Sequence, residues 1–295
     1  MMESLDRLVD RVERLVDRIE AVMPHALQQP DWSASVAFRY RRKAGGAPGL
    51  LPVRLLAPMS FDDLLAVDDQ KERMRANIQR FVKGLPANNV LLTGARGTGK
   101  SSLVKASLHA FSAEGLRLIE VDKDDLVDLP DIAELVSERP ERFVVFCDDL
   151  SFEEGERGYK ALKSMLDGTV SAGGDNVLIV ATSNRRHLLP EYMKENLSYT
   201  HTADGEVHPG EVVEEKISLS ERFGLWISFY PFSQEEYLRI VEQWLGALGV
   251  GSAAHEEARR EALIWALERG SRSGRVAYQF ARHFAGMKGL ETSGA

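Results

Sequence analysis

The chain is poor in cysteine, in basic residues and in long apolar runs. Its only cysteine is Cys147, which excludes an internal disulfide framework and a metal site built from several cysteines. Lys and Arg number 37 against 45 Asp and Glu, a formal charge of −8, so the chain lacks the bulk positive charge that coats nucleic acid. No run is long and apolar enough for a membrane span or a signal peptide. We therefore expect a cytoplasmic protein with no membrane partner.

Apolar residues recur at helical spacing near the start of the chain, with charges between them. The stripe consists of Leu5, Leu8, Val9, Val12, Leu15, Val16, Ile19 and Val22. Residues 2–23 are therefore expected to form an amphipathic helix, buried against the rest of the chain or against a second copy. With 44% hydrophobic residues over its whole length, the chain can build a sizeable core, in one large domain or two smaller ones.

Residues 24–59 are rich in proline and glycine and are expected to be an irregular linker. They contain the one dense basic cluster of the chain, residues 39–43. A solvated basic stretch is one interpretation of this cluster. The alternative is a contact with nucleic acid or with an acidic partner, in which Tyr40 would stack on a base.

A glycine-rich segment between an apolar strand pattern and a helical pattern carries the main chemical signal. It follows Val90–Leu92 and consists of Gly94, Ala95, Arg96, Gly97, Thr98, Gly99, Lys100, Ser101 and Ser102. Glycines let successive backbone N–H groups point into one concavity, and the helix N-terminus adds partial positive charge there. We expect this phosphate loop to hold a nucleoside triphosphate, with Lys100 on the β- and γ-phosphates and Ser101 on Mg²⁺.

Further strand patterns follow at residues 116–121, 143–147, 177–182 and 225–229, and most are separated by helical patterns. This alternation predicts a parallel sheet with helices on both faces. Residues 233–248, 254–268 and 274–287 are expected to be three helices. We divide the chain into an N-terminal helix and linker at 1–59, an α/β domain at 60–231 and a small helical domain at 232–295.

Polar residues end two of the expected strands. Asp148 and Asp149 follow the strand 143–147, and Asn184 closely follows the strand 177–182. In open α/β sheets, ligands bind at the carboxyl ends of the strands. We expect Asp148 to act on the Mg²⁺ side, Asp149 to orient or deprotonate water, and Asn184 to hold water or phosphate. Cys147 is expected to be a small core residue.

Residues 195–215 are polar and rich in turn formers, and they contain His201 and His208. A flexible surface insertion is the first interpretation, because no short metal-ligand spacing accompanies the two histidines. A loop that binds a partner and a metal site remain alternatives.

The order of these elements resembles the AAA+ ATPase superfamily over about residues 60–290. Residues 87–92, 146–152 and 185–193 also resemble the bacterial ATP-binding proteins grouped as domain-of-unknown-function 815. The resemblance implies a doubly wound, five-stranded parallel sheet in AAA+ order, followed by a helical lid. It also implies ATP and Mg²⁺ as cofactors.

The resemblance assigns roles within one subunit. Lys100 and Ser101 match the Walker A lysine and hydroxyl, Asp148 and Asp149 match Walker B, and Asn184 matches the sensor 1 position. Val67 and Asp68 are further expected nucleotide-binding residues.

The resemblance also implies self-association. Arg222 is similar to the arginine finger that AAA+ proteins supply to a neighbouring subunit, and Arg275 is similar to the sensor 2 arginine of the lid. An arginine at the γ-phosphate is worth about 10³ to 10⁵ in rate, so turnover would depend on a homo-oligomer. For each arginine, a surface ion pair is the alternative.

The chain departs from the superfamily at two places. The acid after Asp148 is normally Glu, and the shorter Asp149 could leave the water to Glu153 or Glu154. Turnover is then expected to be slow. Residues 122–129 also lack the aromatic, apolar and glycine loop with which threading unfoldases grip a polypeptide.

These observations favour a Mg²⁺-dependent ATPase that couples nucleotide state to the lid and acts on a protein client that the sequence does not name. One alternative is a nucleotide-gated scaffold with negligible turnover. A second alternative is a loader or remodeller of nucleic acid with residues 39–43 at the contact. A GTPase is disfavoured, because the chain contains no N-K-x-D motif.

Overall fold

The computed structural model describes residues 11, 27, 29–42, 48–56, 59–152, 156–167, 175–184, 200–201, 207–208 and 219–293. The expected N-terminal helix (except residue 11), Glu153, Glu154, residues 185–193 and most of 195–215 therefore lie outside the described residues. Within the described part, no helix is long and apolar enough to cross a bilayer.

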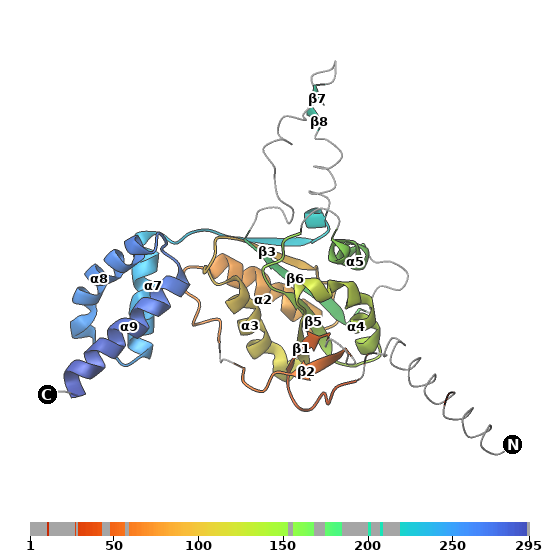
Figure 1. Cartoon of the computed structure of the whole chain (residues 1–295), viewed down its shortest axis with the longest axis horizontal. Helices are drawn as coiled ribbons and strands as arrows, with labels where there is room; N and C mark the ends of the chain where they lie inside the picture. Colours follow the sequence, from red (N-terminus) through yellow and green to blue (C-terminus); the bar gives the residue numbers. More distant parts are fainter. Residues whose placement is uncertain are drawn as a thin grey trace.

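A seven-stranded sheet forms the centre of the molecule, in the order β2–β1–β4–β5–β6–β3–β9 (Figure 1). The strands are β1 (Ala37–Arg41), β2 (Gly49–Pro52), β3 (Val90–Gly94), β4 (Leu116–Glu120), β5 (Arg142–Cys147), β6 (Val177–Ser183) and β9 (Leu225–Phe229). Every pair in this sheet is parallel except β1 with β2. The five strands expected from the sequence are present and contiguous, from β4 to β9.

The sheet has two strands more than expected, and both come from the segment that we interpreted as irregular. In β1 the side chains of Phe38 and Tyr40 are buried, whereas Arg39 between them is partly exposed and Arg41 is exposed. This alternation is typical of a strand that packs one face against a core. The surrounding prolines and glycines, which signal turns, obscured this short alternation. The interpretation of residues 24–59 as an irregular linker was therefore wrong for 37–41 and 49–52.

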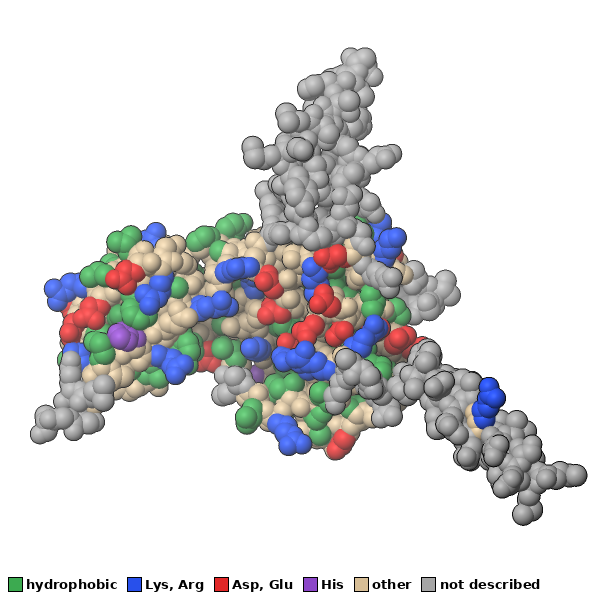
Figure 2. Space-filling model, viewed as in Figure 1, with side chains coloured by type: hydrophobic (Ala, Val, Ile, Leu, Met, Phe, Trp, Pro, Cys, Tyr) green, Lys and Arg blue, Asp and Glu red, His purple; other side chains and the backbone are tan. Residues whose placement is uncertain are grey.

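The basic cluster at 39–42 is engaged within the chain. Arg39 pairs with Glu120 at 2.8 Å and Arg41 with Asp122 at 2.8 Å, while Arg42 pairs with Asp128. Tyr40 is buried and donates a hydrogen bond to the Asp128 carboxylate at 2.7 Å. Its ring cannot stack on a base, so that expectation was wrong. Figure 2 shows acidic and basic side chains interspersed over the face of the molecule in view. Lys43, the last residue of the basic cluster, lies outside the described residues.

Helices cover both faces of the sheet. On one face lie α2 (Asp68–Val82) and α3 (Lys100–Phe111), and on the other lie η2 (Lys123–Asp128), α4 (Leu129–Val136) and α5 (Arg157–Leu166); η1 (Ser112–Glu114) follows α3. Alternate strand residues enter separate cores: Val144 and Phe146 belong to the first, and Phe143 and Val145 to the second. A doubly wound α/β fold follows from this division.

Three helices form a lid at one end of the sheet (Figure 1). They are α7 (Gln234–Ala247), α8 (His255–Glu268) and α9 (Gly274–Ser293), with η4 (Ser252–Ala254) before α8. A capping box between Ser233 and Glu236 begins α7. The sequence predicted all three helices, although α9 continues six residues beyond the expected end at residue 287. Apart from these elements, β7 (Thr200–His201) pairs with β8 (Val207–His208).

Candidate functional site

The glycine-rich segment forms a tight loop between β3 and α3. Gly94, Gly97 and Gly99 have φ angles of 126°, 73° and 104°, a region that residues with a side chain rarely adopt. A Cβ on Gly94 would lie 1.9 Å from the carbonyl oxygen of Phe229. The Thr98 hydroxyl donates to the Ala95 carbonyl at 2.8 Å and closes the loop from within. The loop therefore has the backbone geometry that presents N–H groups to an anion.

Lys100 lies at the first position of α3 and is buried, with 7% of its surface exposed. Its ammonium donates to the carbonyl oxygens of Gly94 and Ala95, at 2.7 and 2.8 Å, and to Asn184 Oδ1 at 3.0 Å. Burial lowers the pKa of Lys100, while the nearby Asp148 and Asp149 carboxylates act in the opposite direction. A desolvated cation at this place attracts phosphate more strongly than one in water.

Ser101 and Asp148 offer oxygen ligands side by side. The Ser101 hydroxyl donates to Asp148 Oδ1 at 2.7 Å, and the Thr182 hydroxyl donates to the same oxygen at 2.6 Å. One carboxylate and one hydroxyl fit Mg²⁺, which protein sites hold through few side chains together with water and phosphate oxygens. Among the described residues no group of three or more His, Cys, Asp or Glu side chains could hold a metal alone.

Asp149 has an unusual backbone, and its carboxylate accepts a hydrogen bond from Asn184. Its φ is 51°, in the left-handed region that Asp and Asn tolerate better than most residues. The Asp149 N–H donates to the Thr182 hydroxyl at 2.8 Å. Asn184 donates to one carboxylate oxygen, and Arg96 lies 3.7 Å from the other. Asn184 therefore accepts a hydrogen bond from Lys100 and donates one to Asp149. Arg96 lies at the edge of this hydrogen-bonded cluster.

A cavity of about 930 Å³ extends from these residues to the lid. Beside Asp63, apolar and aromatic side chains also line it: Met59, Leu65, Phe232, Ile240, Trp244 and Tyr278. The rings of Trp244 and Tyr278 lie 4.7 Å apart. The sequence analysis missed these six residues and also Thr182, because apolar residues at helical spacing are indistinguishable from core residues before the helices are placed.

The lid touches the phosphate loop directly. The N–H of Gly274, at the start of α9, donates to the Gly97 carbonyl at 2.8 Å. A Cβ on Gly97 would lie 2.9 Å from the Ser273 hydroxyl and 3.2 Å from the Arg275 Cβ. Arg275 itself is exposed and lines the cavity. The expected lid arginine and the expected phosphate loop therefore lie at the same site.

Two residues expected to bind the nucleotide lie outside the cavity, and so does the arginine expected to act on a neighbouring subunit. Val67 is buried before α2, and Asp68 pairs with Lys71 at 2.7 Å on the surface; neither lines the cavity. Arg222 pairs with Asp167 and does not line the cavity of its own chain. Cys147 is buried beside Asp148, and burial raises the pKa of its thiol to about 12, which leaves it unreactive.

Three features together define a P-loop ATPase of the AAA+ class. The phosphate loop follows β3, the acids Asp148 and Asp149 follow β5, and a helical lid comes after the sheet. Among solved structures, the Thermotoga maritima RuvB Holliday junction branch migration motor is similar, with a TM-score of 0.55 and 17% identity over 80% of this chain and 67% of that chain. The FIGL-1 AAA domain in complex with ADP has a TM-score of 0.50 and 18% identity over 77% of this chain and 73% of that one. At these identities the likeness shows the fold alone.

The family described as "Protein of unknown function (DUF815)" matches residues 33–288, and the chain belongs to this family. The replication factor C large subunit of Sulfolobus acidocaldarius is 33% identical over 81 residues. This match covers 27% of the chain and only 18% of that protein. The resemblance to AAA+ proteins and to the DUF815 family is thereby confirmed.

Proposed function

We propose that this protein binds ATP with Mg²⁺, hydrolyses it slowly and couples the nucleotide state to its lid. The observation that carries the proposal is the cavity of about 930 Å³ that the two parts of the molecule share. The phosphate loop forms one wall, Arg275 of the lid forms another, and a 2.8 Å hydrogen bond joins Gly274 to Gly97 between them. A ligand that fills this cavity must contact both parts, so its phosphates bias the position of the lid.

The charged residues divide the chemistry. Lys100 and the loop N–H groups bind the phosphate oxygens, and Ser101 and Asp148 hold Mg²⁺. When bound, the metal neutralises charge on the phosphates. Asp149 is the proton acceptor and orienter of the attacking water, Asn184 fixes the Asp149 carboxylate by a hydrogen bond, and Arg275 brings positive charge from the lid.

A neighbouring copy completes the site in this proposal. Arg222 lies outside the cavity of its own chain, as a residue that serves a neighbour must. Closure of the lid and assembly would then act together on a protein client in the cytoplasm. Threading of a polypeptide is disfavoured, because the segment after β4 is a short helix, η2, that buries Leu126 beneath α5.

The proposal is tested by replacing Lys100 with Ala and measuring binding of a fluorescent ATP analogue and release of phosphate. Both ATP binding and phosphate release should be lost. Among the described cations only the Lys100 ammonium is hydrogen-bonded to the carbonyls of the loop that would hold the phosphates. The matched control is Lys160→Ala, which removes an exposed lysine on α5 and should leave both unchanged. Unaltered phosphate release in Lys100→Ala would refute the assignment.

A second candidate is a nucleotide-gated scaffold that binds ATP without turning it over. The favouring observation is Asp149, which is shorter than the usual Glu and has one carboxylate oxygen already hydrogen-bonded to Asn184. Steady-state phosphate release separates the two candidates: turnover above the rate without enzyme supports the ATPase, and tight binding without turnover supports the scaffold. A loader of nucleic acid, in the manner suggested by the names of RuvB and replication factor C, would need a contact other than residues 39–42.

A further inference from the structure

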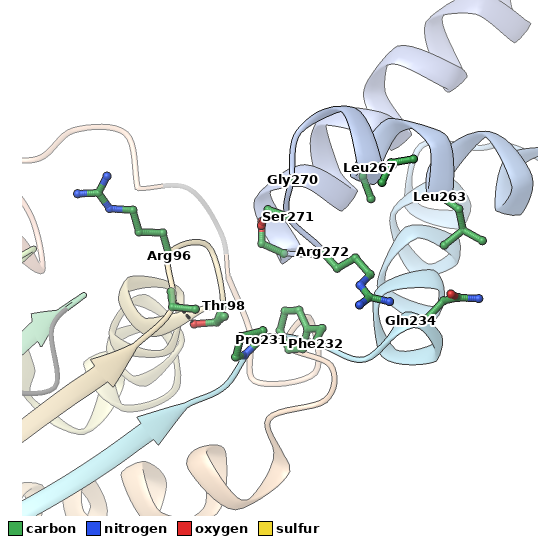
Figure 3. A pocket seen from close by; sticks show the side chains of 13 residues that line it. Arg96, Thr98, Pro231, Phe232, Gln234, Leu263, Leu267, Gly270, Ser271 and Arg272 are labelled. Atoms are coloured by element: carbon green, nitrogen blue, oxygen red, sulfur yellow. Dashed lines mark hydrogen bonds between the residues drawn. The ribbon is translucent and has the colours of Figure 1, made fainter.

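A second cavity, of about 720 Å³, lies beside the phosphate loop at the junction of the lid and the α/β domain (Figure 3). Its walls come from the phosphate loop, the segment that leads into α7, helix α8 and residues 270–273 before α9. The lining residues of the first two are Ala95, Arg96, Thr98, Pro231, Phe232 and Gln234. The nucleotide assignment does not use this space, which shares only Arg96, Thr98 and Phe232 with the larger cavity.

The second cavity is lined by polar and apolar side chains together, and its apolar part continues onto the surface. Phe232, Leu263 and Leu267 line it, and Leu267 is 81% exposed. Ile264, on the next position of α8 after Leu263, is 59% exposed, and Tyr230 is 72% exposed. Scattered exposed apolar residues are ordinary, but a cluster of them around a cavity is typical of an interaction site.

The polar groups of the cavity favour negative charge. Arg272 reaches toward Gln234 across the cavity, whereas Arg96 extends away from it (Figure 3). None of the lining residues is acidic. Of the acids next to them in sequence, Glu268 pairs with Arg269, whereas Glu235, which follows Gln234, is exposed. Arg272 has no ion pair within the part of the chain that the structure describes.

We infer that this cavity binds a segment of a partner protein in which an apolar side chain is flanked by carboxylates. The apolar anchor would cover Phe232, Leu263 and Leu267, and the carboxylates would pair with Arg272. A second copy of this chain fits less well. Two of its exposed apolar side chains elsewhere in the described residues stand near basic ones: Leu55 follows Arg54, and Leu85 lies two residues after Lys83.

The position of the cavity gives the partner influence over the nucleotide site. Thr98 and the backbone of the phosphate loop separate the two spaces. A segment bound between α8 and the phosphate loop would contact both the lid and the α/β domain. This regulatory step depends on the proposed ATPase, whereas the docking itself does not.

The test is selection of short random peptides, displayed on phage, against the immobilised full chain. The expected consensus is one large apolar residue with Asp or Glu on either side. Synthetic copies of the selected peptides should bind Leu267→Asp and Arg272→Glu at least about tenfold more weakly, a loss of about 1.4 kcal/mol. Leu85→Asp, which changes an exposed leucine elsewhere, should bind them as the wild type does.

Reversing the charge of Arg272 tests whether this side chain selects the acidic flanks of the bound segment. Selection on Arg272→Glu should replace the acidic flanks by Lys or Arg. Peptides without an acidic preference, or binding insensitive to both Leu267→Asp and Arg272→Glu, would overturn the inference. Self-association of the full chain that is lost in Leu267→Asp would instead assign the cavity to a second copy. Loss of ATP binding in Lys100→Ala together with unchanged peptide binding would separate the docking from the nucleotide function.

Discussion

At the scale of single residues, the backbone at Asp149 explains a departure from the superfamily. With φ at 51°, this position favours Asp or Asn, and the longer Glu would have to adopt a left-handed conformation that it tolerates less well. The short side chain also places its carboxylate against Asn184. Asp149 is shorter than the usual Glu, but it is the residue type that this backbone conformation tolerates.

Asp149→Glu should consequently lower stability by about 1 kcal/mol, a fall of a few degrees in Tm. Asp149→Asn keeps a side chain that tolerates this backbone but removes the charge, so it should retain the Tm and ATP binding and lose about 10² to 10⁴ in turnover. Thermal melts and phosphate release check the two variants side by side. Full turnover in Asp149→Asn would transfer the role to another acid, such as Glu153 or Glu154.

Tyr237 predicts how stability depends on alkaline pH. Its side chain is buried and donates to the Ala262 carbonyl at 3.1 Å, and burial raises its pKa to about 12. In the unfolded chain a tyrosine loses its proton from about pH 10. Between pH 10 and 12 the unfolded state is therefore the less protonated one, and stability falls as pH rises.

Tyr237→Phe removes this contribution. Below pH 10 it should cost about 1 kcal/mol for the lost hydrogen bond. Above pH 10 the variant should lose stability less steeply than the wild type, by up to about 1.4 kcal/mol per pH unit. Urea unfolding at several pH values measures both effects, and parallel profiles for the two proteins would contradict the assignment.

The residues that we propose to bind phosphate could be found from the sequence, because the chemistry proposed for them depends on local spacing. Gly94 to Ser101 are contiguous in the sequence. Asp148 directly follows a strand, and the alternation of strand and helix patterns predicts that this strand is parallel to its neighbours. Thr182, Trp244 and Tyr278 were missed, since nothing in their own neighbourhoods distinguishes them from core residues. They become site residues only because β6, α7 and α9 converge on one cavity.

At the scale of elements, the contact between the phosphate loop and α9 connects binding to the lid. Gly97 meets Ser273 and Arg275 so closely that a methyl group would push the lid away. The same element joins the loop by the hydrogen bond from Gly274. Loop and lid therefore behave as one unit at this point.

Gly97→Ala tests this coupling, with Gly249→Ala as its matched control. The two glycines have similar φ angles, 73° and 79°, but a Cβ on Gly249 would have no neighbour within 4 Å. Both variants should lose about 1 kcal/mol of stability through backbone strain. Only Gly97→Ala should also weaken ATP binding, which titration with a fluorescent analogue measures. Equal affinities in the two variants would argue against coupling through this contact.

At the scale of the whole molecule, Arg222 is the residue whose role depends on a second subunit. In its own chain it pairs with Asp167, which stands at the C-terminal end of α5. An acid there is disfavoured by the helix dipole, so the pair with Arg222 offsets that cost. This arrangement holds the arginine outside its own cavity.

If Arg222 acts on a neighbour, turnover per subunit should rise with protein concentration, and Arg222→Ala should abolish the rise and lower the plateau by about 10³. Arg41→Ala is the control, since it removes an exposed arginine from a surface ion pair with Asp122. Phosphate release across a range of protein concentrations provides the measurement. A concentration dependence that survives in Arg222→Ala would leave the arginine as a surface ion pair.

The sequence by itself determined the class of fold, the phosphate loop and its acids, and the three lid helices, because strand and helix periodicity and the loop glycines are local properties of the chain. Only the tertiary structure decided that residues 37–41 and 49–52 extend the sheet, that Tyr40 is buried, that Val67 and Asp68 lie away from the cavity, and that the lid touches Gly97. These outcomes depend on contacts between segments far apart in the sequence, and no local pattern specifies which distant partner a short strand or an exposed arginine will find.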